Sequence, residues 1–197
     1  MMHELRLAQV VVTEGDWSSW ISRAIRRATG FEWTHAFIVT GPDELSEAWF
    51  PRVRTHSLAR RMDELAAKGR QHVVLELPEI TDTERALVAD KARSYVGRYY
   101  DVGQILLYYT LKRFWKDGDG TLICSRLVTA AHFSGLGPTR GNLFPPELIA
   151  ALPPEFDGRQ DNLKVGYATP ADLLYSTLAR VGPGAVMSEG YTTDLHS

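Results

Sequence analysis

A predicted β-hairpin in the first third of the chain places the strongest constraint on the fold. Trp33–Thr40 is a largely apolar run whose side chains alternate between two faces, and Leu45–Phe50 is a second strand-like run. Gly41–Asp43, with the sequence Gly-Pro-Asp, lies between them and favours a tight turn. The two runs therefore predict adjacent antiparallel strands. His35 and Glu47 fall on opposite arms, each at a position whose face is otherwise largely apolar.

The rest of the chain mixes helical and strand patterns, which predicts an α+β fold with a mostly antiparallel sheet. Apolar residues recur with helical spacing from Trp17 to Ala28, with arginines on the other side. Thr81 and Glu84 form a capping box that opens a helix to about Val96. We expect further helices at Leu58–Lys68, Val102–Phe114, Cys124–Phe133 and after the N-cap pair Thr169-Pro170, and further strands at Leu7–Val12, Val53–Ser57, His72–Leu77 and Lys164–Tyr167.

Length and composition predict one compact domain. The chain has 197 residues, 44% of them hydrophobic, and we assign residues 1–180 to the domain and residues 181–197 to a loosely held tail. The net charge is −2 with basic residues spread along the chain, so we expect no nucleic-acid partner. Neither a secretion signal nor a membrane span of about 20 apolar residues is visible. We therefore expect a cytoplasmic protein without a stable membrane anchor.

Cys124 is the only cysteine, which excludes an internal disulfide. It follows the short apolar run Leu122-Ile123 and begins a predicted helix. The positive end of the helix dipole and the free N–H groups there favour the reactive thiolate and can receive an oxyanion. On its position alone, a small buried hydrophobic residue is the more common role for a single cysteine.

His35 and Glu47 also allow two interpretations each. His35 lies within a strand among apolar residues, as a neutral core histidine bonded to a backbone carbonyl would. A catalytic base needs a third group that fixes its tautomer, and Glu47 is placed to be that group. A glutamate among apolar residues costs free energy unless it is paired, although an outward-facing strand position would avoid this cost.

The order of several short motifs resembles the circularly permuted NlpC/P60 papain-like enzymes, in particular the YiiX/YaeF-like amidase group. In that group the strand that carries the histidine precedes the helix that carries the cysteine, and the match spans about residues 13 to 175. One departure is Arg98-Tyr99, where the group usually has a small residue or proline before its Tyr-Asp segment. The motifs are Gly15-Asp16, Trp33-Thr34-His35-Ala36, Ser46-Glu47-Ala48, Tyr99-Tyr100-Asp101, Cys124-Ser125-Arg126-Leu127-Val128 and Thr169-Pro170-Ala171-Asp172-Leu173.

The resemblance implies a permuted papain-like (NlpC/P60) fold in which a mostly antiparallel sheet packs against the helix bearing the nucleophile. Cys124 is then the nucleophile, His35 the general base and acid, and Glu47 the residue that orients His35. Tyr100 is expected to donate a hydrogen bond to an oxyanion or to shape the substrate groove, with packing under the helix as the alternative. Trp33 and Trp49 are expected to line the groove. Ser125, Arg126 and Asp101 are expected to be structural.

Three functions remain open from the sequence. The first is a cysteine amidase or peptidase that acts on a small peptide, a cell-wall peptide or a lipid amide through a thioester. The second is an acyltransferase or lipid thioesterase of the lecithin:retinol acyltransferase-like type. The third is a non-enzymatic binding module with the same fold. No cofactor is expected, and no metal, because no His/Cys/Asp cluster has ligand spacing.

Overall fold

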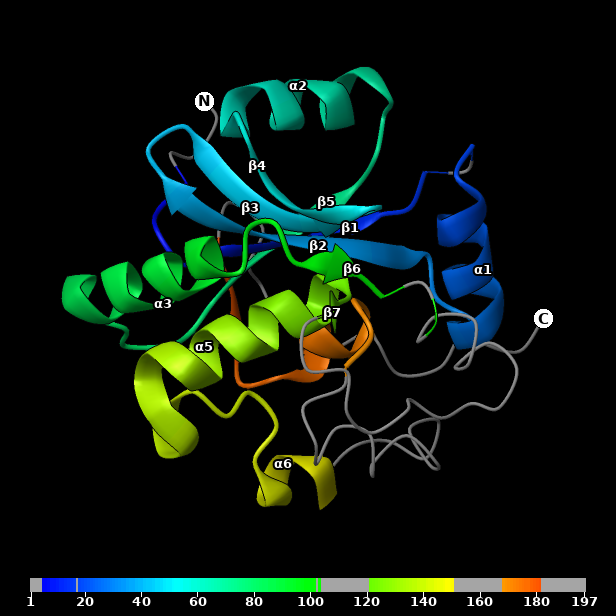
Figure 1. Cartoon of the computed structure of the whole chain (residues 1–197). Helices are drawn as coiled ribbons and strands as arrows, with labels where there is room; N and C mark the ends of the chain where they lie inside the picture. Colours follow the sequence, from blue (N-terminus) through cyan, green and yellow to red (C-terminus); the bar gives the residue numbers. More distant parts are fainter. Residues whose placement is uncertain (1–4, 17, 102, 104–120, 151–167, 182–197) are drawn as a thin grey trace.

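The computed structural model describes residues 5–16, 18–101, 103, 121–150 and 168–181. In these residues one eight-stranded sheet is packed with helices (Figure 1). In chain order the elements are β1 (Val10–Glu14), α1 (Trp20–Thr29), β2 (Trp33–Gly41), β3 (Glu44–Trp49), β4 (Arg52–His56), α2 (Leu58–Ala67), β5 (His72–Glu76), α3 (Asp82–Ser94), β6 (Tyr99–Tyr100), β7 (Thr121–Leu122), α5 (Cys124–Arg140), α6 (Pro146–Ala150), the 3₁₀ helix η2 (Asp172–Tyr175) and β8 (Ala179–Val181).

The sheet has the strand order β7-β6-β4-β3-β2-β1-β5-β8. Every pairing is antiparallel except that of β6 with β7, which is parallel. The predicted hairpin is confirmed as β2 and β3, and the fold is α+β with a mostly antiparallel sheet. The cores of β1, β2 and β3 are buried because helices cover both faces of the sheet.

The hairpin strands β2 and β3 separate before they reach their far ends. Their pairing runs from Gly41↔Glu44 to Ile38↔Ser46. Beyond that point, in the described registers, β2 continues to pair with β1 and β3 continues to pair with β4. His35 therefore lies where the two strands are no longer bonded to each other.

Helices pack on both faces of the sheet (Figure 1). On one face, α2 contributes Leu58 and Leu65 to a cluster with Phe37 and Val39 of β2. On the other face, α3 and α5 pack on the sheet and against each other. Each face of β2 thus belongs to a different hydrophobic core, as the alternation of its side chains predicts. None of the helices among the described residues is long and apolar enough to cross a membrane.

Several predicted boundaries need correction. The first helix begins at Trp20 instead of Trp17, and β1 begins at Val10 instead of Leu7. The helix that starts at Cys124 continues past Phe133 to Arg140, with a break at Gly137 (φ 78°) before Pro138, because proline disfavours helical geometry in the residue before it. The predicted helix at Val102–Phe114 and strand at Lys164–Tyr167 lie outside the described residues, apart from the isolated residue 103.

The predicted helix after Thr169-Pro170 is instead the short 3₁₀ helix η2, which starts at Asp172. The Asp172 carboxylate accepts from the Thr169 backbone N–H at 2.7 Å, and the Thr169 hydroxyl accepts from the Asp172 N–H at 3.3 Å. These two reciprocal bonds have the pattern of a capping box, so the predicted helix start at Thr169 is present although the helix that follows is short. Val181, which we assigned to the tail, is the last residue of β8; residues 182–197 lie outside the described part of the chain.

The capping box of α3 is confirmed, and it yields a stability prediction. The Thr81 hydroxyl accepts from the Glu84 N–H at 3.3 Å, and the Glu84 carboxylate accepts from the Thr81 N–H at 2.9 Å. Thr81→Ala should lower the free energy of unfolding in urea by about 1 kcal/mol. Thr83→Ala, at an exposed position in the same turn, is the matched control and should change it by less than about 0.5 kcal/mol. Equal effects in both variants would contradict this role of the cap.

Candidate functional site

The start of α5 places the Cys124 thiol. Ile123 is the extended N-cap residue and Cys124 is the first residue of the helix, as the sequence predicts. β7 leads directly into this helix start, and its parallel pairing sets Tyr100 opposite Leu122. The thiol therefore lies at the positive end of α5, which is helical from Cys124 up to the break at Gly137, and next to the first-turn N–H groups, which have no acceptor within the helix.

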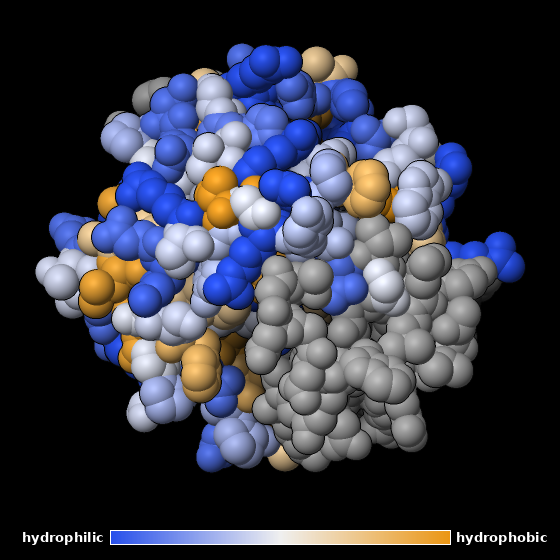
Figure 2. All heavy atoms as spheres, in the orientation of Figure 1, coloured by the Kyte–Doolittle hydropathy of each residue, from blue (hydrophilic) through white to orange (hydrophobic). Residues whose placement is uncertain are grey.

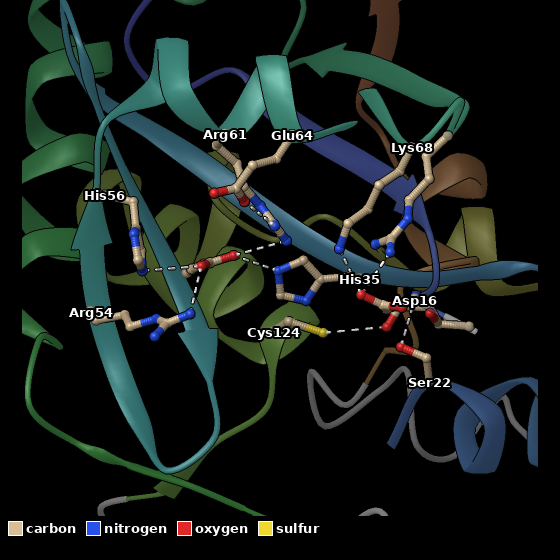
Figure 3. A network of polar contacts seen from close by, with 12 residues as sticks. Asp16, Ser22, His35, Arg54, His56, Arg61, Glu64, Lys68 and Cys124 are labelled. Atoms are coloured by element: carbon tan, nitrogen blue, oxygen red, sulfur yellow. Dashed lines mark hydrogen bonds and ion pairs between the residues drawn. The ribbon is translucent and has the colours of Figure 1, made fainter. Parts of the chain in front are cut away.

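The thiol is buried at the meeting point of several elements. Cys124 is 1% exposed and packs with Tyr100, Ile123 and, from α1, Ile25. Its sulfur lies 4.0 Å from the Thr34 carbonyl oxygen on β2, at the limit of a weak S–H bond. Figure 3 shows the thiol directly beside the ring of His35, the next residue on β2. The fold thus brings together two residues that are 89 positions apart in the sequence.

His35 is held from two sides. Its Nε2 lies 2.8 Å from Glu47 Oε2, which leaves Nδ1 as the ring nitrogen available to Cys124. Burial alone would lower the pKa of His35, but hydrogen bonding to Cys124 and Glu47 and the charges of both groups raise it to about 9. The structure therefore favours an imidazolium that stays charged at neutral pH.

Glu47 is a carboxylate within the sheet, with 1% of its surface exposed. Besides His35, three basic side chains approach it: Arg54 and Arg61 at 3.5 Å each and His56 at 3.4 Å. Burial alone would raise the pKa of Glu47, but the hydrogen bond to His35 and the charges of His35, Arg61 and Arg54 lower it to about 2. The sequence predicted the His35–Glu47 pair but not the other three residues.

Trp49 covers the His35–Glu47 pair. Its ring meets the His35 ring edge-on, with centroids 5.0 Å apart. The guanidinium carbons of Arg54 and Arg61 lie 5.4 and 5.1 Å from the centre of the Trp49 ring. These contacts give Trp49 a screening position over the pair, while the predicted role in lining a substrate groove stays a prediction.

The other aromatic candidates differ in their relation to the thiol. Tyr100 is buried in the same cluster as Cys124, and burial together with the charges of Cys124 and Asp101 raises its pKa well above its usual value. Its phenol therefore stays protonated and remains a hydrogen-bond donor. Trp33 packs against the main core of the domain, and its predicted place in a groove is likewise still a prediction.

Residues of two other motifs, Ser125 and Gly15-Asp16, contact the segments that carry or adjoin the site. The Ser125 hydroxyl donates to the Ala168 carbonyl, which ties the first turn of α5 to the segment that precedes η2. Gly15 packs so closely that a Cβ atom there would collide with the Thr34 hydroxyl, and the Asp16 carboxylate binds Arg70 at 2.7 Å. Ser125 is thus structural, as expected, and glycine at position 15 allows the close contact with Thr34 beside His35.

Comparisons with known proteins agree with this fold. No family model matches the chain, and no curated protein matches its sequence. A solved structure, metalloprotein YiiX from Escherichia coli O157:H7, superposes with a TM-score of 0.63 at 18% identity, over 91% of this chain and 98% of that chain. This chain has a YiiX-like fold.

The name of that protein raises the question of a metal site. Among the described residues of this chain, no group of three or more His, Cys, Asp and Glu side chains is arranged to hold a metal ion. The His35 imidazole instead contacts Glu47 through Nε2 and has the Cys124 thiol beside it (Figure 3). The described residues do not fit a metal centre.

The charges of the site predict how its histidines titrate. By ring ¹⁵N chemical shifts, His35 should keep its second proton until about pH 9. Buried His132, whose Nδ1 bonds the Val128 carbonyl, should stay neutral down to about pH 4 and serves as the internal control. Glu47→Gln should lower the pKa of His35 and leave that of His132 unchanged. Titration of both rings near about pH 6.5 would rule out this electrostatic description.

Proposed function

We propose that this protein is a cysteine hydrolase that cleaves an amide bond through a thioester acyl-enzyme. Its fold is then the circularly permuted papain-like (NlpC/P60) arrangement, with Cys124 as nucleophile, His35 as general base and acid, and Glu47 as the residue that orients His35. The observation that supports this most is the imidazole of His35, which lies between the Cys124 thiol and a buried carboxylate at 2.8 Å. A core histidine in a binding module has no need of either partner.

Acylation starts from the thiolate–imidazolium form of the Cys124–His35 pair. The Cys124 thiolate attacks the carbonyl carbon of the amide and forms a tetrahedral intermediate. The imidazolium of His35 then gives its Nδ1 proton to the amide nitrogen, the C–N bond breaks, and the amine leaves. The Cys124 sulfur keeps the acyl group as a thioester, and His35 is neutral.

Stabilisation of the oxyanion falls to donors around the start of α5. The first-turn N–H groups of a helix point out of its N-terminus, toward the space next to the Cys124 sulfur. The protonated phenol of Tyr100, buried in the same cluster, is the side-chain donor that fits this role. Together they offer hydrogen bonds where negative charge develops on the carbonyl oxygen.

Deacylation reverses the proton transfer. Neutral His35 takes a proton from water through Nδ1, and the resulting hydroxide attacks the thioester carbonyl. The C–S bond then breaks, releasing the carboxylic acid and restoring the thiolate and imidazolium. Glu47 holds Nε2–H throughout and transfers no proton.

Access to the thiol requires movement. Cys124 is 1% exposed, and Ile25 of α1 packs in the same apolar cluster. A substrate therefore has to displace side chains around the thiol before its carbonyl carbon can reach the sulfur.

A small substrate panel tests the proposed activity. Peptide, cell-wall stem-peptide, acyl-amide and ester substrates are incubated with the protein, and the intact mass is measured after rapid acid quenching. We expect at least one amide to give product and an acyl adduct on Cys124, and Cys124→Ala to give neither. Transfer of the acyl group to an added acceptor in preference to water would favour an acyltransferase. Unchanged turnover in Cys124→Ala would overturn the mechanism.

The role of Glu47 gives a graded prediction. Glu47→Gln can still accept a hydrogen bond from the His35 Nε2–H, so kcat/KM should fall by only about tenfold, whereas Glu47→Ala should lose about a hundredfold or more. Glu44→Gln, on the same strand but paired with Arg93 away from His35, is the matched control and should be unchanged. Equal and negligible losses in both Glu47 variants would mean that another group orients His35.

A further inference from the structure

We propose that Arg61 is a positioning residue of this site: its guanidinium keeps Glu47 ionised and thereby sets the acid limit of Cys124 reactivity. The inference rests on the proposed function, because it concerns how the Cys124–His35 pair is kept charged. Arg61 comes from α2, on the face of the sheet opposite α5, and belongs to none of the motifs that the sequence brought forward.

Arg61 approaches the His35–Glu47 pair from the face of the sheet that α2 covers. Its Nη2 lies 3.5 Å from Glu47 Oε2, the same oxygen that contacts His35 Nε2. Only 12% of the Arg61 side chain is exposed. Figure 3 shows the labelled Arg61 side chain reaching from α2 toward His35, whose Nε2 contacts the same Glu47 oxygen.

The charges around Glu47 single out Arg61 among its neighbours. A carboxylate that is almost fully buried needs compensating charge to stay ionised. From β4, Arg54 is 44% exposed and thus screened by water, while burial lowers the pKa of His56 and favours its neutral form. From β2, His35 owes its charge to Glu47 itself and to Cys124 of α5, which also faces the phenol of Tyr100 on β6. Arg61 is the permanent cation beside Glu47 whose side chain is largely shielded from water, at 12% exposed.

Arg61 is itself held in place. Its Nη1 lies 3.2 Å from Glu64 on the same helix, and its guanidinium stacks over the Trp49 ring. Figure 2 shows a largely hydrophilic outer surface over α2. The Arg60 side chain is 81% exposed, whereas Arg61 points inward (Figure 3). The neighbouring arginines therefore differ in surroundings while sharing a helix and the partner Glu64.

The sign of the pH effect follows from the depressed pKa of Glu47. When Arg61 is replaced by a neutral residue, the pKa of Glu47 rises and the carboxylate takes a proton at a higher pH. A neutral Glu47 stabilises the His35 imidazolium less than the carboxylate does, so the population of the charged pair with Cys124 begins to fall at that higher pH. At alkaline pH, where Glu47 is ionised in both proteins, the difference disappears.

The test uses iodoacetamide and the intact mass of the full chain, in which Cys124 is the only thiol. For Arg61→Gln, the pH at which alkylation falls to half its plateau should rise by about one unit, a roughly tenfold slower reaction at a fixed acidic pH. The plateau rate should stay within about twofold of wild type. Arg61→Lys keeps the positive charge, so its half-plateau pH should stay close to that of the wild type. Arg60→Gln should leave the half-plateau pH unchanged.

The outcomes separate the inference from the proposed function. If wild-type Cys124 still reacts in acid and Arg61→Gln has the same pH profile, the role of Arg61 is overturned and the proposed function is not. A uniform loss of rate at every pH, with no rescue by Arg61→Lys, also overturns it, because that result reports only damage to the fold. If Arg61→Gln does not fold, two other variants test the inference. Arg61→Lys must keep the wild-type pH profile. Glu64→Gln removes the partner that holds Arg61, and it must alter the profile. If wild-type Cys124 reacts only as an ordinary thiol, above about pH 8, the proposed function fails and the inference fails with it.

Discussion

A buried carboxylate determines how the rest of the site is arranged. Glu47 is 1% exposed, and an isolated charge at such a position would be strongly unfavourable. The fold surrounds it with basic groups from three elements: His35 of β2, Arg54 and His56 of β4, and Arg61 of α2. Each of these contacts also fixes the direction of the carboxylate. The imidazole that the carboxylate holds is consequently fixed as well, which a freely rotating surface glutamate could not achieve.

The separation of β2 from β3 allows the Cys124 thiol to reach His35. Glu47 and Arg61 approach His35 from the face of the sheet that α2 covers, whereas Cys124 belongs to α5, which packs on the other face. A continuous hydrogen-bonded ladder would keep these groups on opposite sides. Because the pairing of β2 and β3 ends at Ile38↔Ser46, the thiol at the helix start meets the imidazole where the strands part.

Much of this architecture could be predicted from the sequence, because local patterns specify it. The alternation in Trp33–Thr40 and the turn at Gly41–Asp43 specified the hairpin, and the Thr81–Glu84 spacing specified the cap of α3. Arg61 could not be found in this way, because its contact with Glu47 depends on where α2 packs, and in the sequence it is one charge among several on an amphipathic helix. The extension of α5 past Phe133 was missed because glycine and proline near residues 137 and 138 favour a helix end.

The YiiX-like fold and the site geometry support the proposed chemistry in different ways. The fold likeness concerns the backbone alone, whereas the chemistry depends on whether His35 activates Cys124. The most direct measurement is the rate of Cys124 alkylation by iodoacetamide in wild type and His35→Ala from acidic to alkaline pH. The account predicts that the wild-type thiol reacts well below pH 7 and that the His35→Ala thiol reacts only at about pH 8 and above. Identical profiles in the two proteins, with reaction confined to alkaline pH, would contradict it.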